Sequence, residues 1–382
     1  MITLKHKGYD IVLVCTNYFT LRAFLMPMVG FIEKDYSICV VANITADEQK
    51  QIIDEFAYTI DFHIINIQRK PNIVLDLLSL VYLIKLIFKA KPKIVLSIMS
   101  KSGLLSMLAS YICRVPNRVH FFTGQHWCTK TGITRYLYKR IDKLIVFLCT
   151  KILVDGRGQK NFLVSENVAP SNEIDLIWNG SINGVEFDKI TFNQNDKLRI
   201  RDEIGVRPHE RLILFMSRMT VEKGFNEVLL SYKALRSISS HYKLLLIGPD
   251  EECLVEKKKY NDYAGIHYIS YTKEAAKYIY ACDAFVSPSY KEGLPTTLLQ
   301  ALSLNAKVFV SDVYGNNDLI EHEVNGYLHP VRDWTTLYQQ IHCAMEGNIK
   351  CLVPGYDKRI RRDYDRRVFQ QHFRNYIRSL NG

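Results

Sequence analysis

Leu212-Ile-Leu-Phe-Met216 is a run of apolar residues that leads into a polar loop, residues 217–224, and then into a helical pattern, residues 225–237. A short apolar run followed by a loop and a helical segment is typical of a buried parallel strand and its covering helix. Tyr242-Lys-Leu-Leu-Leu-Ile247 repeats the apolar run and ends at Gly248-Pro249. These residues predict the start of a doubly wound α/β sheet.

The same alternation fills both halves of the chain. In the second half we expect strands at 267–269, 284–287 and 308–310 and helices at 273–281, 297–303, 335–346 and 365–380. In the first half we expect strands at 11–15, 37–42, 64–67, 92–97, 118–122, 152–154 and 174–177, and helices at 73–89, 103–113 and 135–150. Strands that alternate with helices imply parallel sheets covered on both faces.

A polar stretch, residues 188–211, has the composition of a linker and the opening helix of a second domain. A chain of 382 residues suits two domains of ordinary size. We predict Rossmann-like domains at 1–188 and 189–360 and a terminal helix at 361–382 that crosses back to the first domain. Ligands of such sheets bind beyond the carboxyl ends of the strands, so we expect the site in a cleft between the domains.

Composition predicts a globular, cytoplasmic protein. Apolar residues make up 48% of the chain and charged residues 23%, which excludes disorder. The nine cysteines form no Cys-x-x-Cys pair, as expected of reduced thiols, and residues 1–8 show no secretory signal. The most apolar segment, residues 73–88, carries Asp76 and Lys85 and is too short to span a bilayer. We interpret it as an amphipathic or buried helix of a soluble or peripheral protein.

The net charge of +11 is concentrated in the first half, where residues 61–180 hold 17 Lys and Arg against 7 Asp and Glu. Such a field attracts nucleic acid, anionic lipid or phosphorylated substrates, and a merely solvated basic surface is the plain alternative. Neither zinc-finger spacing nor an RNP-type aromatic motif is present, which disfavours nucleic acid. For an anionic membrane surface the candidate contacts are Lys85, Lys89, Lys91 and Lys93 with Ile84, Ile87 and Phe88.

Three segments of the second half suggest an anion site. Arg218 and Lys223 lie in the loop after the first strand, where a guanidinium can bind two oxygens of a pyrophosphate and an ammonium adds a point charge. Taken alone, a loop with Arg and Lys is weak evidence, and surface cations are the favoured interpretation. Gly248 follows the next strand and is either a plain turn or a close approach for a base or ribose.

The third segment is Glu292-Gly293-Leu294-Pro295-Thr296-Thr297, a turn that opens a helix containing Gln300. The N–H groups and hydroxyls of a helix start form a natural anion site. We expect Glu292 to accept hydrogen bonds from sugar hydroxyls and Gln300 to reach a ribose.

Together these motifs, with Asn325-Gly-Tyr-Leu328, resemble the family 4 retaining glycosyltransferases of GT-B fold. The resemblance implies that Arg218 and Lys223 bind the donor diphosphate and that Glu292 contacts the transferred sugar. It also implies that Gln300 stands where the family has a ribose-binding Glu, so the chain departs from the family's Glu-x7-Glu motif there. A further expectation is retention of configuration by a front-face route.

The first half, from Phe121-Phe-Thr-Gly-Gln-His-Trp127 to the segment 177–187, resembles bacterial capsule and O-antigen transferases. The resemblance implies transfer of N-acetylgalactosamine or another hexose from a UDP-sugar to an undecaprenyl-diphosphate-linked saccharide, at the inner face of the plasma membrane. Thr123-Gly124 stands where relatives carry His-Gly, so His126 is the candidate substitute. The acceptor-side residues expected from it are Asn17, Thr123, Gly124 and Asn179.

We expect a metal-independent enzyme whose only ligands are the donor and the acceptor. Asp363-Tyr-Asp365 spells the Asp-x-Asp motif of metal-dependent transferases, but its arginine neighbours favour a solvated ion-pair cluster. Arg218, Lys223 and the helix start at Thr296 must then neutralise the leaving phosphate. Two alternatives stay open: a sugar-nucleotide 2-epimerase of the same fold and a non-catalytic assembly partner.

Overall fold

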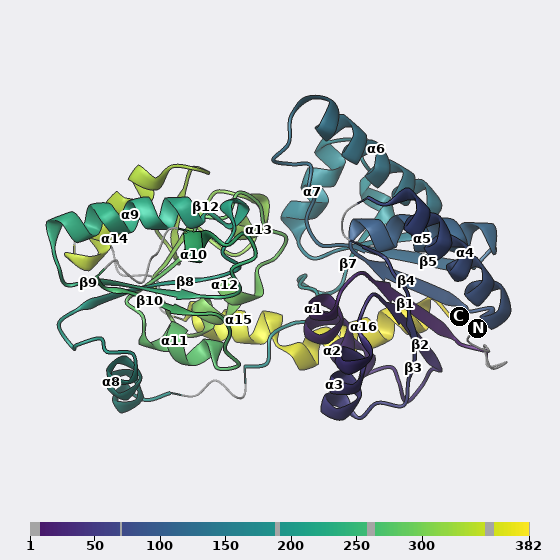
Figure 1. Cartoon of the computed structure of the whole chain (residues 1–382), viewed down its shortest axis with the longest axis horizontal. Coiled ribbons are helices and arrows are strands. Elements are labelled where there is room, and N and C mark those ends of the chain that lie inside the picture. Colours follow the sequence, from purple (N-terminus) through teal and green to yellow (C-terminus); the bar gives the residue numbers. More distant parts are fainter. Residues whose placement is uncertain (1–7, 69–70, 188–191, 258–263, 348–354, 382) are drawn as a thin grey trace. The chain divides into compact units, whose positions relative to one another are not determined.

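The computed structural model describes residues 8–68, 71–187, 192–257, 264–347 and 355–381 (Figure 1). The chain divides into two compact units: Met1–Gly184 with Arg367–Gly382, and Val185–Arg366. The boundaries expected from sequence, after residues 188 and 360, lie a few residues away. Residues 1–7, which belong to the segment expected to hold no secretory signal, and residues 188–191 of the expected linker lie outside the described residues. None of the described helices is long and apolar enough to cross a bilayer.

The first unit is built on a seven-stranded sheet in the order β3-β2-β1-β4-β5-β6-β7, with every pairing parallel. The order reverses between β1 and β4, as in a doubly wound fold. The strands are β1 (Ile11–Cys15), β2 (Ile38–Ala42), β3 (Asp61–Ile64), β4 (Ile94–Ile98), β5 (Asn117–Phe122), β6 (Lys151–Val154) and β7 (Ile174–Leu176).

Helices cover both faces of this sheet (Figure 1). In β1, Ile11 and Leu13 face one core cluster while Val12 and Val14 face the other, which explains why the strand is apolar without alternation. One face carries α4 (Ile73–Ala90), α5 (Ser100–Ile112), α6 (Gly132–Leu148) and α7 (Arg157–Ser165). The other carries α1 (Tyr18–Thr20), the π-helix η1 (Leu21–Leu25), α2 (Met26–Val29), α3 (Ala46–Phe56) and α16 (Arg366–Ser379). The short 3-10 turn η2 (Ser171–Glu173) precedes β7.

The terminal segment is two helices rather than one. The α15 helix (Tyr356–Tyr364) belongs to the second unit, and Asp365 leaves helical geometry with a ψ of 135° before α16 begins. Phe369, Phe373 and Ile377 of α16 are buried in the core of the first unit. The apolar spacing of these three residues puts them on one face of the helix, and that face attaches the end of the chain to the first sheet.

The second unit repeats the scheme with a six-stranded parallel sheet in the order β10-β9-β8-β11-β12-β13. The strands are β8 (Arg211–Met216), β9 (Tyr242–Ile247), β10 (Ile266–Ile269), β11 (Ala284–Ser287), β12 (Val308–Ser311) and β13 (Tyr327–His329). The helices are α8 (Gln194–Glu203), the 3-10 turn η3 (Val221–Lys223), α9 (Phe225–Ile238), α10 (Leu254–Lys257), α11 (Ala275–Ala281), α12 (Thr296–Ser303), α13 (Tyr314–Asn317), α14 (Trp334–Met345) and α15. The prediction of two doubly wound α/β domains is confirmed.

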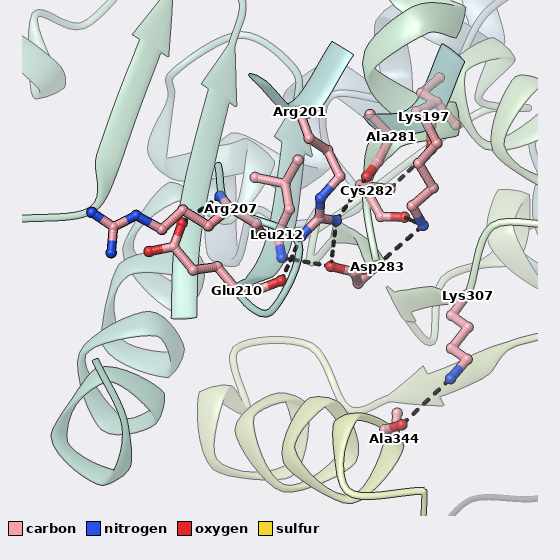
Figure 2. Close-up of polar contacts among 11 residues, drawn as sticks. Lys197, Arg201, Arg207, Glu210, Leu212, Ala281, Cys282, Asp283, Lys307 and Ala344 are labelled. Atoms are coloured by element: carbon pink, nitrogen blue, oxygen red, sulfur yellow. Dashed lines mark hydrogen bonds and ion pairs between the residues drawn. The ribbon is translucent and has the colours of Figure 1, made fainter. Parts of the chain in front are cut away.

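A buried ion-pair network fastens α8 to the amino ends of β8 and β11 (Figure 2). The Arg201 guanidinium donates to Asp283 Oδ2 at 2.8 Å, and the Leu212 N–H donates to the same oxygen at 2.8 Å. Burial raises the pKa of Asp283, but the hydrogen bonds from Arg201 and Leu212 outweigh it and leave that pKa below its usual value. The network occupies the amino edge of the sheet, so the opposite edge is free for the loops that form a site.

Candidate functional site

The carboxyl ends of β8 and β11 mark the point where the strand order of the second sheet reverses. Loops that leave neighbouring strands in opposite directions open a crevice at such a point, which is where doubly wound sheets bind ligands. The loop after β8 carries Arg218 and Lys223, and the loop after β11 carries Glu292, Gly293 and Leu294. The fold of this unit therefore gathers most of the predicted donor-binding residues at one edge.

Two glycines let these loops approach each other closely. Gly224 has a φ of +79°, and a Cβ at that position would lie 2.1 Å from the carbonyl oxygen of Pro288 in the loop after β11. Gly248 has a φ of +138°, and its Cβ would lie 2.0 Å from the carbonyl oxygen of Ser217. Both positions require glycine for close approach as well as for backbone conformation. Gly248 is thus a packing residue that brings the loop after β9 against the loop after β8.

Two parallel ion pairs join the loops after β8 and β11. The Lys223 Nζ lies 2.7 and 2.8 Å from the two carboxylate oxygens of Glu292. One residue earlier in each loop, the Lys291 Nζ lies 2.6 Å from Glu222 Oε1. The Tyr290 N–H also donates to the Glu222 carbonyl at 2.9 Å. Glu222-Lys223 and Lys291-Glu292 are dipeptides of reversed charge, a signal in the sequence that reveals the pairing once the two loops are known to be neighbours.

Arg218 is held from the other side, by the loop after β9. Its Nη1 donates to Glu251 Oε2 at 2.8 Å, and both side chains are about one-third exposed. Asp250 is occupied in capping α10, where its carboxylate accepts the N–H groups of Leu254 and Val255 at 2.7 and 2.8 Å. Glu251, Glu222 and Lys291 were not predicted as site residues. Each of them lies in or beside a predicted motif: Glu222 in the loop 217–224, Lys291 just before Glu292, and Glu251 just after the Gly248-Pro249 turn.

The turn before α12 has the expected form of a helix start. Leu294 is buried, Pro295 is the N-cap residue, and Thr296 and Thr297 form the first turn with half-buried side chains. The first N–H groups of a helix have no partner within it and carry the positive end of its dipole. Gln300 lies one turn further along α12 and is half-buried.

Hydrogen bonds among buried polar residues hold the segment that leads into this turn. Ser289 and Ser311 are fully buried, and the Ser311 hydroxyl donates to the Ser289 carbonyl. The Asn316 amide donates to the Ser311 carbonyl at 2.8 Å. These bonds connect the loops after β11 and β12 and hold the segment that ends in Glu292.

The candidate acceptor-side residues lie on three loops at the carboxyl edge of the first sheet. Asn17 follows β1, caps α1 by accepting the Thr20 N–H at 2.8 Å, and donates to Met99 Sδ at 3.4 Å. Thr123 and Gly124 follow β5, with Gly124 at a φ of +90°. Asn17 therefore has a local structural role in addition to any contact with a ligand.

His126 has an exposed side chain, while its neighbour Trp127 is buried. The Trp127 indole donates to the buried Asp142 carboxylate of α6 at 2.7 Å, which fixes the loop that carries His126. Asn179, in the turn after β7, is half-buried and accepts a hydrogen bond from Arg157 at 3.4 Å. His126 and Asn179 thus lie on separate loops of the same edge.

The predicted Asp-x-Asp motif forms ion pairs. Asp363 accepts from Arg362 Nε at 2.7 Å and lies 3.6 Å from Arg359 Nε. Among the described residues no group of three or more His, Cys, Asp or Glu side chains is arranged to hold a metal ion.

Residues 196–361 match the family model of the glycosyl transferases group 1. Among curated proteins, the chain is 25% identical to the capsular polysaccharide biosynthesis glycosyltransferase CapM of Staphylococcus aureus, over 81% of this chain and 80% of that one. It is 25% identical to the UDP-Gal:alpha-D-GlcNAc-diphosphoundecaprenol alpha-1,3-galactosyltransferase of Escherichia coli, over 71% of each. It is 22% identical to the N,N'-diacetylbacillosaminyl-diphospho-undecaprenol alpha-1,3-N-acetylgalactosaminyltransferase of Campylobacter jejuni, over 85% and 86%.

Solved structures share the fold. HepE of Anabaena, in complex with UDP-glucose, superposes with a TM-score of 0.78 at 14% identity and covers 97% of this chain and 100% of that one. The UDP-GlcNAc 2-epimerase of Neisseria meningitidis superposes with a TM-score of 0.67 at 14% identity, over 97% and 99%. At this level of identity the likeness concerns the fold alone, two doubly wound α/β units of the GT-B class.

Proposed function

We propose that the chain, whose residues 196–361 match the glycosyl transferases group 1, is a glycosyltransferase of polysaccharide biosynthesis that transfers a hexose from a UDP-sugar to a lipid-linked saccharide. The observation that carries the proposal is the pairing of Lys223 with Glu292 beside the start of α12. A cation, a carboxylate and a helix amino end at one strand edge suit the phosphates and the hydroxyls of an activated sugar.

In the proposed mechanism, the donor diphosphate is bound by Lys223, Arg218 and the first turn of α12. The ammonium and guanidinium groups neutralise the charge that develops as the sugar–phosphate bond breaks, so no metal ion is required for that step. Glu292 accepts hydrogen bonds from hydroxyls of the sugar, and Gln300 donates to the ribose. When the diphosphate arrives, Lys223 exchanges one carboxylate oxygen for a phosphate oxygen, and Arg218 leaves Glu251.

The reaction proposed is a transfer with retention of configuration. The bond from the anomeric carbon to the phosphate oxygen breaks, a bond to the acceptor hydroxyl forms on the same face, and the hydroxyl proton passes to the departing phosphate. UDP and the extended saccharide are the products. Two of the relatives are named as transferring a sugar to a diphosphoundecaprenol-linked acceptor, and one of them transfers N-acetylgalactosamine, which supports that donor sugar and that acceptor class here.

On the acceptor side we propose that Thr123, Gly124 and His126 contact the acceptor saccharide, with Asn17 and Asn179 on the flanking loops. These loops share one edge of the first sheet, and the exposed His126 imidazole is able to donate to or accept from a sugar hydroxyl. We further propose that the protein works at the anionic inner surface of the plasma membrane, where a lipid-linked acceptor resides.

The test is a donor screen with the purified protein. UDP-N-acetylgalactosamine, other UDP-hexoses and GDP-sugars are incubated with and without a synthetic polyprenyl-diphosphate-linked N-acetylglucosamine, and the products are resolved by mass spectrometry. We expect an added hexose only when the acceptor is present, with an α-linkage by NMR. Conversion of the donor sugar without acceptor would instead show an epimerase, and absence of UDP binding by calorimetry would show a non-catalytic partner.

A further inference from the structure

Large apolar side chains gather on the outward surface of α4, α5 and α6 in the first unit. This surface holds fourteen of the twenty-four large apolar side chains that are exposed in the described part of the chain. They are Ile73, Val74, Leu77, Leu78, Val81 and Phe88 of α4, Tyr111 and Ile112 of α5, and Ile133, Tyr136, Leu137, Tyr138, Leu144 and Phe147 of α6. A concentration of this kind on one surface marks an interaction site. We call it the α4–α6 face.

The α4–α6 face is additional to the core-facing side of the same helices. Leu83, Leu86 and Ile87 of α4 and Ile145 of α6 pack against the sheet. Residues 73–89 were expected to form an amphipathic or buried helix, and instead α4 is apolar on its outer side as well. Ile87, expected from sequence to face lipid, is buried and points to the core. The exposed apolar side chains of α4 are instead those of Phe88 and of residues in its first turns.

The three helices that carry the face lie side by side. The α5 helix packs between α4 and α6, and Figure 1 shows all three on the same side of the sheet. At the carboxyl end of α5, the Tyr111 ring lies 6.1 Å from the Phe147 ring of α6. The exposed side chains of α5 and α6 meet at this end, and α4 lies on the other side of α5.

The charge of this region selects the partner. Residues 73–148 contain twelve Lys and Arg and two acidic residues, Asp76 and Asp142. Asp76 is paired with Lys101 at 2.7 Å and Asp142 is buried, so even with both acids ionised this segment keeps a net charge of +10. A second copy docked through the same face would bring cations against cations, which opposes association. An apolar surface surrounded by lysine and arginine matches an anionic lipid bilayer.

We propose that the α4–α6 face inserts into the interface of an anionic bilayer, with α4 and α6 lying along the membrane plane. The cations Lys85, Lys89, Lys91, Lys93 and Arg140 lie at the level of the lipid phosphates. Lys and Arg side chains extend far enough for their apolar stems to lie over lipid while the charge stays in the head-group layer.

The α6 helix of this face also contacts the candidate acceptor loop, which contains Thr123, Gly124 and His126. The Trp127 indole binds Asp142 of α6 at 2.7 Å, and Arg135 of α6 donates to the Trp127 carbonyl at 3.3 Å. Helices that connect parallel strands run antiparallel to them, so the amino ends of α4 and α6 lie at the strand edge where Thr123 and His126 are. Membrane docking then brings that edge to the surface from which a lipid-linked saccharide projects, an assignment that rests on the proposed function.

The test compares two double variants for binding to vesicles of phosphatidylcholine and phosphatidylglycerol. L77E with L137E alters the face, at side chains that are 57% and 54% exposed. L198E with I238E is the matched control on α8 and α9, at 53% and 52%. We expect the first variant to lose at least about tenfold in vesicle binding, because two leucines no longer leave water. The control should stay within about twofold of the parent, since its sites lie away from the face.

A third variant, K85Q with K89Q, should bind the same vesicles more weakly and with a smaller dependence on salt. Parent-like vesicle binding by L77E/L137E would overturn the proposal, as would a dimer in sedimentation velocity that the same substitutions abolish while vesicle binding is absent. UDP titration and transfer to a detergent-dispersed acceptor are measured in parallel. Vesicle binding without UDP binding would refute the proposed function but support the docking face. UDP binding without vesicle binding would refute the docking face but not the proposed function.

Discussion

The ammonium group of Lys223 contacts both carboxylate oxygens of Glu292, at 2.7 and 2.8 Å, across two loops that are sixty-nine residues apart in sequence. The pair is only partly exposed, with 18% of the lysine and 12% of the glutamate side chain accessible. Partial burial strengthens the attraction relative to a surface pair. The contact therefore fixes the lysine at the strand edge before a donor arrives.

Replacement of Lys223 by Ala should lower the rate of sugar transfer by about 10²-fold or more, since preorganised charge at a leaving group has an effect of this size. Arg218→Ala should act in the same direction. The measurement is the initial rate with saturating donor and acceptor. Lys277→Ala is the matched control, because Lys277 is a 19% exposed, ion-paired lysine on α11. If both site variants turned over at the rate of this control, the donor assignment would fail.

Glu292→Gln should separate binding from chemistry. The amide keeps the shape of the side chain but removes the charge, so sugar hydroxyls lose a charged acceptor, a change that costs about 10- to 10²-fold in transfer. Lys223 loses its counter-charge and is freer to bind phosphate, so UDP affinity should hold or rise. Calorimetric titration with UDP beside rate measurements checks this. A loss of UDP affinity as large as the loss of rate would show instead that Glu292 acts by maintaining the structure of the loop and does not contact the sugar.

Glu251→Gln should tighten donor binding. In the structure Glu251 accepts from Arg218 at 2.8 Å, so a diphosphate has to displace it. Because both groups are partly exposed, the pair is worth at most about 1 kcal/mol, and the affinity gain should not exceed about fivefold. Glu274→Gln, at the exposed N-cap position of α11, should leave the affinity unchanged. Weaker UDP binding in E251Q would mean that Glu251 itself contacts the nucleotide.

Periodicity predicted most of the strands because both sheets are parallel and buried on both faces. The expected ranges 242–247 and 284–287 coincide with β9 and β11. The third strand shows the limit of the method, since it was expected at 64–67 and lies at Asp61–Ile64. As an edge strand β3 has half-exposed residues, whereas Ile65 and Ile67 just beyond it are buried and supplied the apolar signal.

Motifs located the loops of the donor site but not the partners of their charged residues. The sequence places Lys223 and Glu292 in separate motifs, and only the neighbouring positions of β8 and β11 bring them together. Nothing in the sequence indicated that Arg218 pairs with Glu251, because this pairing depends on the path of the chain after Gly248. Helices α3, α7 and α15 were not predicted at all, because polar residues dominate their sequences and leave few apolar positions from which to recognise a helix.

Stability should depend on pH through Asp142, and Asp142→Asn should remove that dependence. Burial raises the pKa of Asp142 from its usual value of about 3.8 to about 7, and the hydrogen bond from Trp127 offsets part of this rise. Between about pH 4 and pH 7 the folded protein keeps a proton that the unfolded chain releases, so stability falls as pH rises through this window. The loss from this group is complete above about pH 7 and amounts to at most about 4 kcal/mol.

Denaturant unfolding of parent and D142N at about pH 5 and about pH 8 measures the effect, and the advantage of D142N should grow with pH. Asn is a suitable replacement because its amide oxygen still accepts from the Trp127 indole at the same position. Trp127→Phe supplies the complementary case: it removes the one hydrogen bond that lowers the pKa of Asp142, so the fall in stability should move to higher pH. An equal pH dependence in parent and D142N would contradict the prediction and show that Asp142 is ionised throughout this pH range.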